Sequence, residues 1–481
     1  MPCNRIAYER EHRQELSMLE RELSRISQIS STGRRVENLA YLLNTDLLRQ
    51  CFKELDPNKA SGIDKVTKGD YAQHLERNLE QLVAKLRGGI YSPQPSRRVY
   101  IPKPGTDKMR PLGISCFEDK IVERAIAKIL NAVYEPKFLD CSYGFRPKRN
   151  CHLAVSVLLK SIHQKTSYVV EADIRSCFDT IDHNWLLTFL EHDIADRRFI
   201  EIIRRGIKAG HFEDGMFHLH DAGTMQGSGY SPVLCNVFLH YVLDTWFRFL
   251  KESPMAPYSM RFRGDVQLVR YADDFVATFQ YKDDAERFYR LLKQRFTKYG
   301  FALAGEKTRI IRFGRFAARD AETDFLMGRS ERRKPDTFDF LGFTFYCSLN
   351  KKGRFCCKIK SAAKRVKTKL KKISEWLKAN RSMGLEEYIK HICRVLNGYF
   401  NYYCVTCNEY CTSAFRFNVI KLMFKWLNRR SQRKSYTWEE FLMVIEKYKV
   451  PKAYFRVDIY HYHDEWLLEE PCARIGHARN L

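Results

Sequence analysis

Long apolar runs, regularly spaced cysteines and acidic residues are all scarce in this sequence, and each scarcity excludes a class of protein. No apolar run reaches the length of about eighteen residues that a membrane-spanning helix needs, so we expect no membrane partner. The first residues, Met1 to Arg13, are polar and lack the apolar segment of a signal peptide. The fifteen cysteines have no regular spacing, which favours free thiols and a cytoplasmic location.

The shortage of acidic residues leaves a strongly basic chain. Lysine and arginine number 83 against 57 aspartate and glutamate residues, which gives a formal net charge of +26. Such an excess is typical of proteins that bind a polyanion through phosphate contacts, and it makes affinity depend on salt. The length of 481 residues suffices for roughly three globular domains.

Hydrophobic periodicity predicts a mixture of helices and strands. We expect a helix from about Arg35 to Leu55, an unbroken apolar helix from Val233 to Leu250, and a single strand from Phe338 to Phe345. After residue 350 the pattern becomes helical and basic, because Lys351 to Asn380 holds twelve Lys or Arg residues against one acid.

Two adjacent carboxylates, Asp273 and Asp274, lie between two apolar, β-prone stretches. The sequence predicts a hairpin whose tight turn carries both side chains. Carboxylates are hard oxygen ligands of the kind that Mg²⁺ prefers, although an acidic turn that merely faces solvent is the alternative. A third carboxylate, Asp173, follows the β-prone run from Ser167 to Val170. On a neighbouring strand, Asp173 would complete a site for two Mg²⁺ ions, the arrangement that promotes in-line phosphoryl transfer. That the three carboxylates lie close together is a hypothesis.

Two further stretches carry groups suited to a nucleotide. A predicted hairpin from Arg97 to Ile114 would carry Lys103 and Arg110, cations that fit a triphosphate, although a solvated basic hairpin is the alternative. The glycine-rich loop from Gly223 to Pro232 would let the backbone approach a nucleotide, and its Gln226 could contact a base or sugar.

The basic C-terminal stretch predicts a surface for phosphates. An apolar stripe on the expected helix would pack inward and leave lysines outward, and this face either follows an RNA backbone or is simply solvated. The lysines concerned are Lys364, Lys367 and Lys371. Further on, Cys404, Cys407 and Cys411 fall on one face of a predicted helix. Without a fourth ligand at zinc-like spacing they are typical of buried core thiols, although a metal remains the alternative.

These motifs, in this order, resemble those of the group II intron-encoded reverse transcriptases, and the resemblance extends from about residue 50 to the C-terminus. The catalytic motifs are matched by Asp173 to His183 and Tyr271 to Asp274, and the positioning loop by Gln226 to Pro232. The remaining motifs are matched by Arg98 to Ile114, Tyr143 to Pro147, Gly305 to Thr308 and Phe340 to Phe343. The sequence departs from the family's usual residues at Met225, Ser228 and Cys177. These departures put the fidelity of copying and the binding of the template in question.

The resemblance implies roles for individual residues. Asp173, Asp273 and, less directly, Asp274 would hold two Mg²⁺ ions with help from the backbone carbonyl of Ile174. Phe178 would be the steric gate that excludes a ribose 2′-hydroxyl. The other implied contacts are phosphate binding by Lys103 and Arg110, nucleotide positioning by Gln226, leaving-group neutralisation by Lys307, and a primer grip formed by Phe340, Leu341 and Gly342.

The resemblance also implies an α+β fold: a right-hand polymerase, with an antiparallel sheet in fingers and palm, followed by an α-helical thumb/maturase domain. The reverse transcriptase domain would span about residues 85–345. The expected parts are an N-terminal helical extension (1–55), fingers (56–165), palm (166–350), thumb/maturase (351–450) and a C-terminal tail (451–481).

The implied function is an RNA-directed DNA polymerase that copies RNA into cDNA and binds intron RNA as a maturase. Its partners would be an RNA template, a DNA or RNA primer, dNTPs and structured intron RNA. The cysteine pairs of the family's endonuclease domain are missing, so we expect no second-strand cleavage. Two alternatives stay open: a host-adopted reverse transcriptase in phage defence or DNA repair, and an RNA-binding splicing factor without polymerase activity. An RNA-templated RNA polymerase is disfavoured by Phe178.

Overall fold

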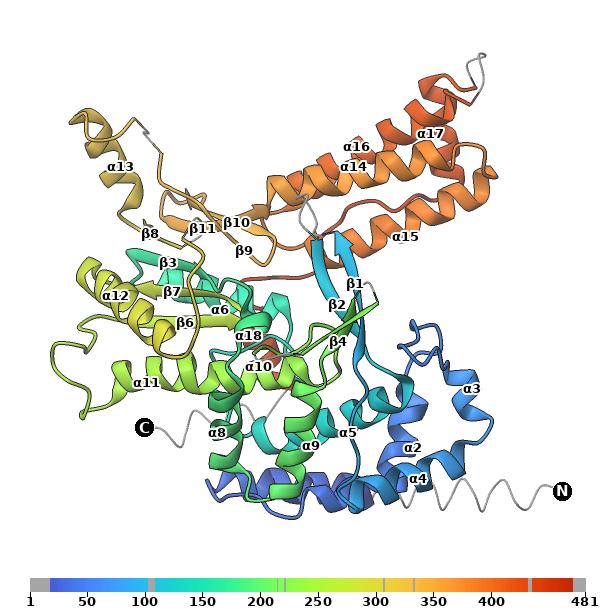
Figure 1. The fold of residues 1–481 in the computed structure, drawn as a ribbon. Coiled ribbons are helices and arrows are strands. Elements are labelled where there is room, and N and C mark those ends of the chain that lie inside the picture. Colours follow the sequence, from blue (N-terminus) through green and yellow to red (C-terminus); the bar gives the residue numbers. More distant parts are fainter. Residues whose placement is uncertain are drawn as a thin grey trace.

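The computed structural model combines helices with three β-sheets in the part of the chain that it describes, in agreement with the mixed α and β content expected from the sequence (Figure 1). The described residues are 18–102, 109–213, 215–219, 222–305, 308–331, 334–430 and 435–469. No helix among them is both long and apolar enough to cross a membrane. All thirteen cysteines within these ranges are free thiols.

A four-stranded antiparallel sheet in the order β6-β7-β3-β8 occupies the centre of the chain and is called the central sheet here. Both of its faces are buried, which explains why its strands read as nearly continuous apolar runs. Alternate residues enter two different cores: Val170 packs with α12 (Lys282–Lys298), whereas Val169 packs with α6 (Cys151–His163). The strands are β3 (Tyr168–Asp173), β6 (Val266–Tyr271), β7 (Asp274–Phe279) and β8 (Arg309–Arg312).

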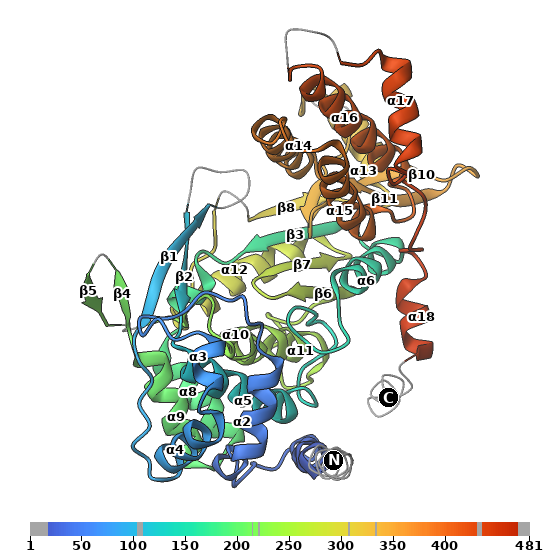
Figure 2. The same ribbon diagram turned by 90° about the vertical axis from the view of Figure 1, so that its right-hand side faces the viewer.

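A second sheet, called the outer sheet, has the order β2-β1-β4-β5. Its first hairpin joins two antiparallel strands, and β1 pairs in parallel with β4 from much later in the chain. Figure 2 shows the β4–β5 hairpin projecting beside β1, away from the body of the molecule. The strands are β1 (Ser96–Pro102), β2 (Met109–Ile114), β4 (His211–Glu213) and β5 (Met216–His218).

The N-terminal half of the chain supplies most of the helices outside the C-terminal bundle. Residues 18–31 are helical, but the helix expected from Arg35 begins only at Thr45, because the Asn44 side chain caps it by accepting a hydrogen bond from the Leu47 amide. The helices in this half are α2 (Thr45–Glu54), α3 (Lys68–Ala72), α4 (Leu75–Arg87), α5 (Phe117–Tyr134), α6, α7 (Cys177–Thr180), α8 (His183–Asp193) and α9 (Arg197–Lys208), with the 3₁₀ turn η1 (Ala40–Leu42) before α2.

The apolar helix expected from Val233 to Leu250 is interrupted. It consists of α10 (Ser231–Leu239), a π-helical turn η2 (His240–Asp244) and α11 (Thr245–Glu252). Such π turns insert one residue and often occur at functional sites. Here the turn brings the Asp244 carboxylate to a buried arginine of β6, a contact that the hydrophobic pattern alone does not reveal.

The single strand expected from Phe338 to Phe345 is in fact a tight hairpin. Strand β9 (Phe338–Phe340) ends at Leu341 and Gly342, which both have positive φ values of 49° and 84°, and β10 (Phe343–Leu349) runs back antiparallel to it. A period-two pattern does not distinguish a reversing chain from a straight one. Strand β11 (Phe355–Ser361) completes this third sheet.

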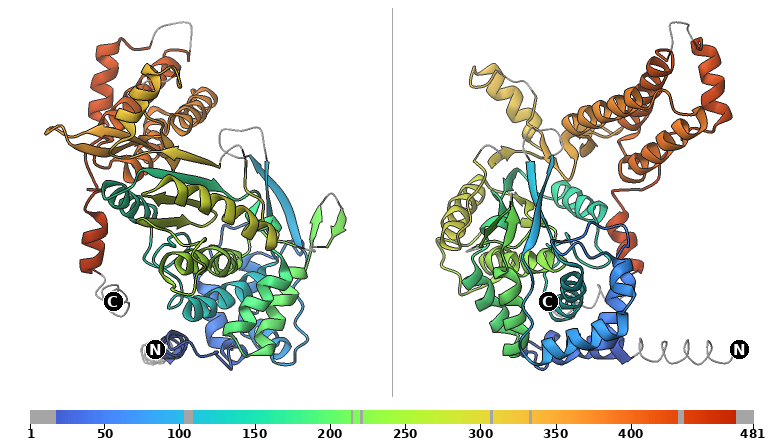
Figure 3. Two further views of the ribbon diagram at one scale, coloured as in Figure 1. Left: turned by 90° about the vertical axis from the view of Figure 1, so that its left-hand side faces the viewer. Right: turned by 45° about the vertical axis from the view of Figure 1, so that its right-hand side comes forward.

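Four C-terminal helices form a bundle with its own apolar core, and Figures 1 and 3 show that the bundle stands clear of the rest of the chain. The helices are α14 (Ala363–Ala379), α15 (Leu385–Tyr403), α16 (Glu409–Leu427) and α17 (Trp438–Lys447); α13 (Ala317–Leu326) and α18 (Tyr462–Glu469) lie outside the bundle.

The prediction that three cysteines share one face of a helix is wrong. Cys404 follows the end of α15, Cys407 lies in a turn with a φ of 70°, and Cys411 belongs to α16. The helical pattern of the sequence runs through this turn, so it does not reveal the break.

Candidate active site

The three predicted carboxylates meet at one end of the central sheet. Asp173, the last residue of β3, lies directly opposite Asp274, the first residue of β7. Cross-strand partners present their side chains on the same face of a sheet. Asp273 occupies the turn between β6 and β7, next to Ala272, whose φ of 58° makes the turn tight. The structure therefore brings these acids together from positions about a hundred residues apart, as the register of a paired strand allows.

The carboxylates influence one another electrostatically. The pKa of Asp274 is raised to about 7, first by burial and then by the negative charges of Asp173 and Asp273, whereas Arg365 opposes the rise. Mutual repulsion of this kind is relieved by a divalent cation, and three carboxylates are the donor set that suits Mg²⁺. Among the described residues, no three His, Cys, Asp or Glu side chains already converge as a complete ligand set.

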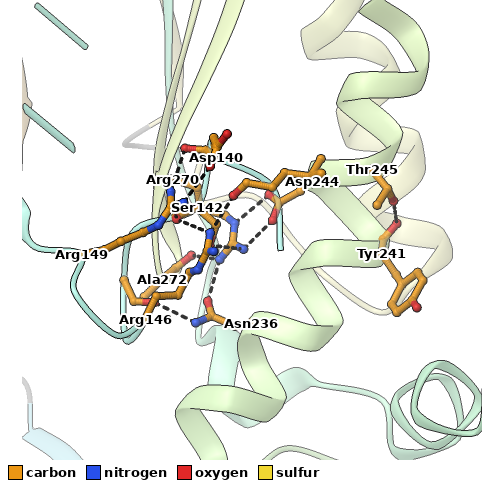
Figure 4. A network of polar contacts seen from close by, with 12 residues as sticks. Asp140, Ser142, Arg146, Arg149, Asn236, Tyr241, Asp244, Thr245, Arg270 and Ala272 are labelled. Atoms are coloured by element: carbon orange, nitrogen blue, oxygen red, sulfur yellow. Dashed lines mark hydrogen bonds and ion pairs between the residues drawn. The ribbon is translucent and has the colours of Figure 1, made fainter. Parts of the chain in front are cut away.

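A buried arginine fixes the turn that carries Asp273. Arg270 donates from Nη1 to the carbonyl oxygen of Ala272 at 3.0 Å and to Oδ1 of Asn236 at 2.9 Å (Figure 4). Its Nε and Nη2 bind the two carboxylate oxygens of Asp244 at 2.8 and 2.6 Å, and Nη2 also donates to Ser142 Oγ at 2.8 Å. Sequence reasoning missed this residue, because an arginine inside an apolar strand carries no local sign of its partners.

The loop that contains Tyr143 to Pro147 supports the same turn from the other side. The Tyr143 amide donates to the Arg270 carbonyl oxygen at 2.8 Å. Gly144 lies so close that a Cβ atom on it would come within 2.4 Å of the Ala272 nitrogen, so only glycine fits there. Arg146 is buried and holds the loop through Glu135 at 2.6 Å. This loop therefore has a structural role that its sequence motif alone did not indicate.

The glycine-rich loop connects the outer sheet to the segment after Asp173. Its Thr224 amide donates to the Phe178 carbonyl oxygen at 2.6 Å, and its Gln226 side chain donates to Asp179 at 3.1 Å. The Gly113 amide of β2 donates to the Gln226 carbonyl oxygen at 2.8 Å. Phe178 is half-buried and lies on the short helix α7. Backbone bonds thus fix the glycine-rich loop, which carries Gln226, to the segment after Asp173, which carries Phe178.

Two of the four remaining predicted site residues lie in the part of the chain that the structure describes. Arg110 is exposed on β2, opposite Ile101 of β1. Ile174 is buried directly after Asp173 and bridges to Leu303. Lys103 and Lys307 lie outside the described residues.

The predicted primer grip is the tight turn between β9 and β10. The Leu341 carbonyl oxygen accepts a hydrogen bond from the Tyr402 hydroxyl at 2.6 Å, which ties the turn to α15, and Phe340 beside it is buried. A Cβ atom on Gly342 would lie 2.7 Å from the Tyr403 hydroxyl and 3.3 Å from Cδ of Arg365. Arg365 also acts electrostatically on Asp274, so the turn lies between the carboxylate end of the central sheet and the C-terminal bundle.

Two family models match this chain. The model described as reverse transcriptase (RNA-dependent DNA polymerase) matches residues 101–345, just over half of the chain. The model described as the group II intron, maturase-specific domain matches residues 366–441. The chain belongs to the group II intron reverse transcriptase/maturase family.

Individual relatives agree with this family. The group II intron-encoded protein LtrA of Lactococcus lactis subsp. cremoris is 37% identical over 218 residues, 44% of this chain and 36% of that protein. Protein YkfC of Escherichia coli K12 is 34% identical over 237 residues, 45% of this chain and 62% of its own length. An uncharacterised 91 kDa protein in a cob intron of Schizosaccharomyces pombe is 32% identical over 240 residues, 48% of this chain and 29% of its own. The matches thus span 29% to 62% of each relative's own length.

The lysines predicted to bind phosphates lie on α14, the first helix in the region that matches the maturase-specific domain. The buried residues of α14 are Ile373 and Leu377, and the opposite face carries the lysines. Lys364, Lys367 and Lys371 are all exposed, and Lys371 makes only a long 4.0 Å ion pair with Glu375. This face is free of packing and strongly positive, as binding to a phosphate backbone would need.

Proposed function

We propose that this protein is an RNA-directed DNA polymerase that copies RNA into cDNA and binds intron RNA as a maturase. One observation carries the proposal: Asp173 stands opposite Asp274 on paired strands, with Asp273 in the adjoining turn. A protein that only bound RNA would not need three acids at one end of a sheet, with a buried arginine fixing the turn that carries one of them. Membership of the reverse transcriptase family, and the similarity to a protein named as encoded by a group II intron, support the same reading.

In the proposed reaction, Asp173, Asp273 and Asp274 would hold two Mg²⁺ ions, assisted by the carbonyl of Ile174. When bound, such ions make the primer 3′-hydroxyl a stronger nucleophile and neutralise phosphate charge. The protein's own residues orient the partners. Arg110, with Lys103, would bind the phosphates of the dNTP, and Lys307 would neutralise the leaving pyrophosphate.

The neighbouring residues would select and hold the substrates. Phe178 would exclude a ribose 2′-hydroxyl by occupying its space, and Gln226 would position the nucleotide against the template. Phe340, Leu341 and Gly342 would hold the primer end, because their turn lies between the carboxylates and the C-terminal bundle. Positioning of this kind supplies much of the rate of a phosphoryl transfer.

We assign the polymerase parts accordingly. Residues 56–165 would be the fingers, residues 166–350 the palm, and residues 351–450 the thumb/maturase domain, with an N-terminal extension and a C-terminal tail. The separate apolar core of the α14–α17 bundle supports the assignment of residues 351–450 to a domain of their own. The exposed lysines of α14 would contact structured intron RNA. The free thiols suit a reducing cytoplasm.

Extension of a DNA primer on an RNA template tests the proposal. With Mg²⁺ and dNTPs the wild type should extend the primer, and Asp273→Ala should lower the rate by about a hundredfold or more. Asp265→Ala is the matched control, because Asp265 lies at the far end of the same hairpin in an exposed pair with Lys165 at 3.1 Å. RNA binding should be unchanged in both variants. Wild-type extension by Asp273→Ala would refute the site, and RNA binding without any extension by the wild type would favour the splicing-factor alternative.

A further inference from the structure

One face of the outer sheet carries two exposed aromatic rings. Phe212 of β4 and Phe217 of β5 are cross-strand partners, and Phe212 is also the partner of Arg97 on β1. Partners across strands share a face, so the three side chains form one row. The rings are 5.6 Å apart between centroids, and Phe212 and Phe217 remain 37% and 47% exposed. Exposed neighbouring rings on a projecting hairpin mark a binding surface rather than a stray apolar residue.

The same face continues along β1 and onto β2. Alternation along β1 places Ile101 on the face of Arg97, and Ile101 is the partner of Arg110 on β2. Arg110 is exposed, and Ile101 is 47% exposed. The face therefore runs from the aromatic pair to the cation that we assign to the dNTP. We call the set Phe212, Phe217, Arg97, Ile101 and Arg110 the aromatic–basic face.

The opposite face of this sheet is occupied by contacts within the protein. The Tyr100 hydroxyl donates a hydrogen bond to Glu213, and Arg98 forms an ion pair with Glu213 at 3.5 Å. The rings of His211 and His218 stack at 5.1 Å. These contacts anchor the β4–β5 hairpin to β1 and fix the direction in which Phe212 and Phe217 point. The aromatic pair is thus presented on a supported strand pair.

The chemistry of this face selects its partner. Exposed rings beside arginines on a sheet bind unpaired nucleic acid, because bases stack on the rings and phosphates contact the cations. The net charge of +26 favours the same polyanion. The Gly113 amide of β2 donates to the Gln226 carbonyl oxygen at 2.8 Å, so β2 is bonded directly to the positioning loop.

We propose that Phe212 and Phe217 stack the bases of the unpaired RNA template before it enters the active site. This assignment rests on the proposed polymerase function. Arg97 donates from Nη2 to the Ser61 carbonyl oxygen at 3.0 Å and flanks the rings, and exposed Arg110, the cation that we assign to the dNTP, lies farther along the same face. Stacking tolerates any base sequence, as a template path requires.

Binding of two RNA–DNA duplexes tests the proposal. One duplex has a 5′ RNA template overhang of about eight nucleotides, within the usual range for stacking platforms, and the other is blunt. Fluorescence anisotropy without dNTPs should show that the wild type prefers the overhang. Phe212→Ala/Phe217→Ala should weaken binding of the overhang duplex by roughly tenfold and leave the blunt duplex unchanged. Tyr258→Ala and Tyr410→Ala are matched controls, because these rings are 87% and 85% exposed elsewhere.

Further variants separate stacking from structure. Phe212→Tyr/Phe217→Tyr keeps both rings and should retain the overhang preference, whereas Phe212→Leu/Phe217→Leu keeps apolar bulk without rings and should lose it. A wild-type overhang preference in the leucine variant would overturn the proposal. So would a change of oligomeric state with the overhang preference intact, since the face would then join two copies of the chain. Measurement in an Asp273→Ala background keeps the result independent of polymerase activity.

Discussion

Arg270 and Asp244 form a bidentate ion pair, with N–O distances of 2.8 and 2.6 Å, inside the protein next to the turn that carries Asp273. Both side chains are wholly buried. Arg270 belongs to β6, whereas Asp244 ends the π-helical turn η2, so the pair connects two elements that are distant in sequence. Because Arg270 also binds the Ala272 carbonyl oxygen, the pair sets the position of the turn that presents Asp273.

Asp244→Asn should lower the free energy of unfolding by about 3–5 kcal/mol, because it leaves the Arg270 charge buried without a counter-charge. Urea denaturation of the purified protein measures the loss. Asp265→Asn is the control: its pair with Lys165 at 3.1 Å has both side chains about two-thirds exposed, and such pairs contribute about 0–1 kcal/mol. Equal effects of the two substitutions would show that burial of the Arg270 pair does not matter.

The carboxylates could be predicted from the sequence because their signals are local. Asp273 lies in a turn between two β-prone runs, and Asp173 follows another such run. The residues next to each aspartate therefore predict the strands that carry it. Arg270 could not be found in this way, since nothing beside it in the sequence identifies Asp244 or Asn236. The same limit applies to the hairpin at Leu341, where apolar residues continue through the reversal and the pattern resembles one strand.

Phe178→Ala should raise the incorporation of ribonucleotides, because the ring would no longer fill the space of a 2′-hydroxyl. We expect the preference for dNTPs over NTPs to fall by roughly tenfold or more. The main chain should stay in place, since the Thr224 amide still binds the Phe178 carbonyl oxygen at 2.6 Å. Steady-state kcat/KM for each nucleotide class measures the change. Phe178→Tyr, which keeps the ring, should retain the preference, and unchanged discrimination in the alanine variant would refute the gate.

His240 should make stability depend on pH. Burial lowers the pKa of this ring to about 4, with Arg270 adding to the effect and Asp244 opposing it. An unfolded histidine titrates near 6.5, so the unfolded state binds a proton first. The contribution of neutral His240 is complete above pH 6.5 and is lost as pH falls toward 4, by about 2 kcal/mol between pH 7 and pH 5.

His240→Phe should remove that loss. The new ring can keep the edge contact that His240 makes with Phe138 at 5.6 Å, and it removes Nδ1, which is buried without a hydrogen-bond partner in the described part of the chain. Urea denaturation at pH 7 and pH 5 measures the difference relative to the wild type. Exposed His74→Gln should keep the wild-type difference. If His240→Phe also keeps it, the ring is not the titrating group.

Charge reversal on α14 tests whether its lysines contact RNA. The triple variant Lys364→Glu, Lys367→Glu and Lys371→Glu should weaken RNA binding at low salt, because each lost phosphate contact also removes counterion release. The slope of log K against log salt should become shallower by up to about two. Filter binding of a structured RNA over a salt series measures both quantities.

The matched control reverses three exposed lysines on α12, Lys282, Lys293 and Lys298, and changes the net charge of the protein by the same amount. If RNA responds only to overall charge, the two variants will lose equal affinity and equal slope. If α14 contacts phosphates directly, only its variant will show the shallower slope, since α12 covers the central sheet on a different side from the bundle (Figure 1). Equal slopes would mean that the lysine face of α14 is simply solvated.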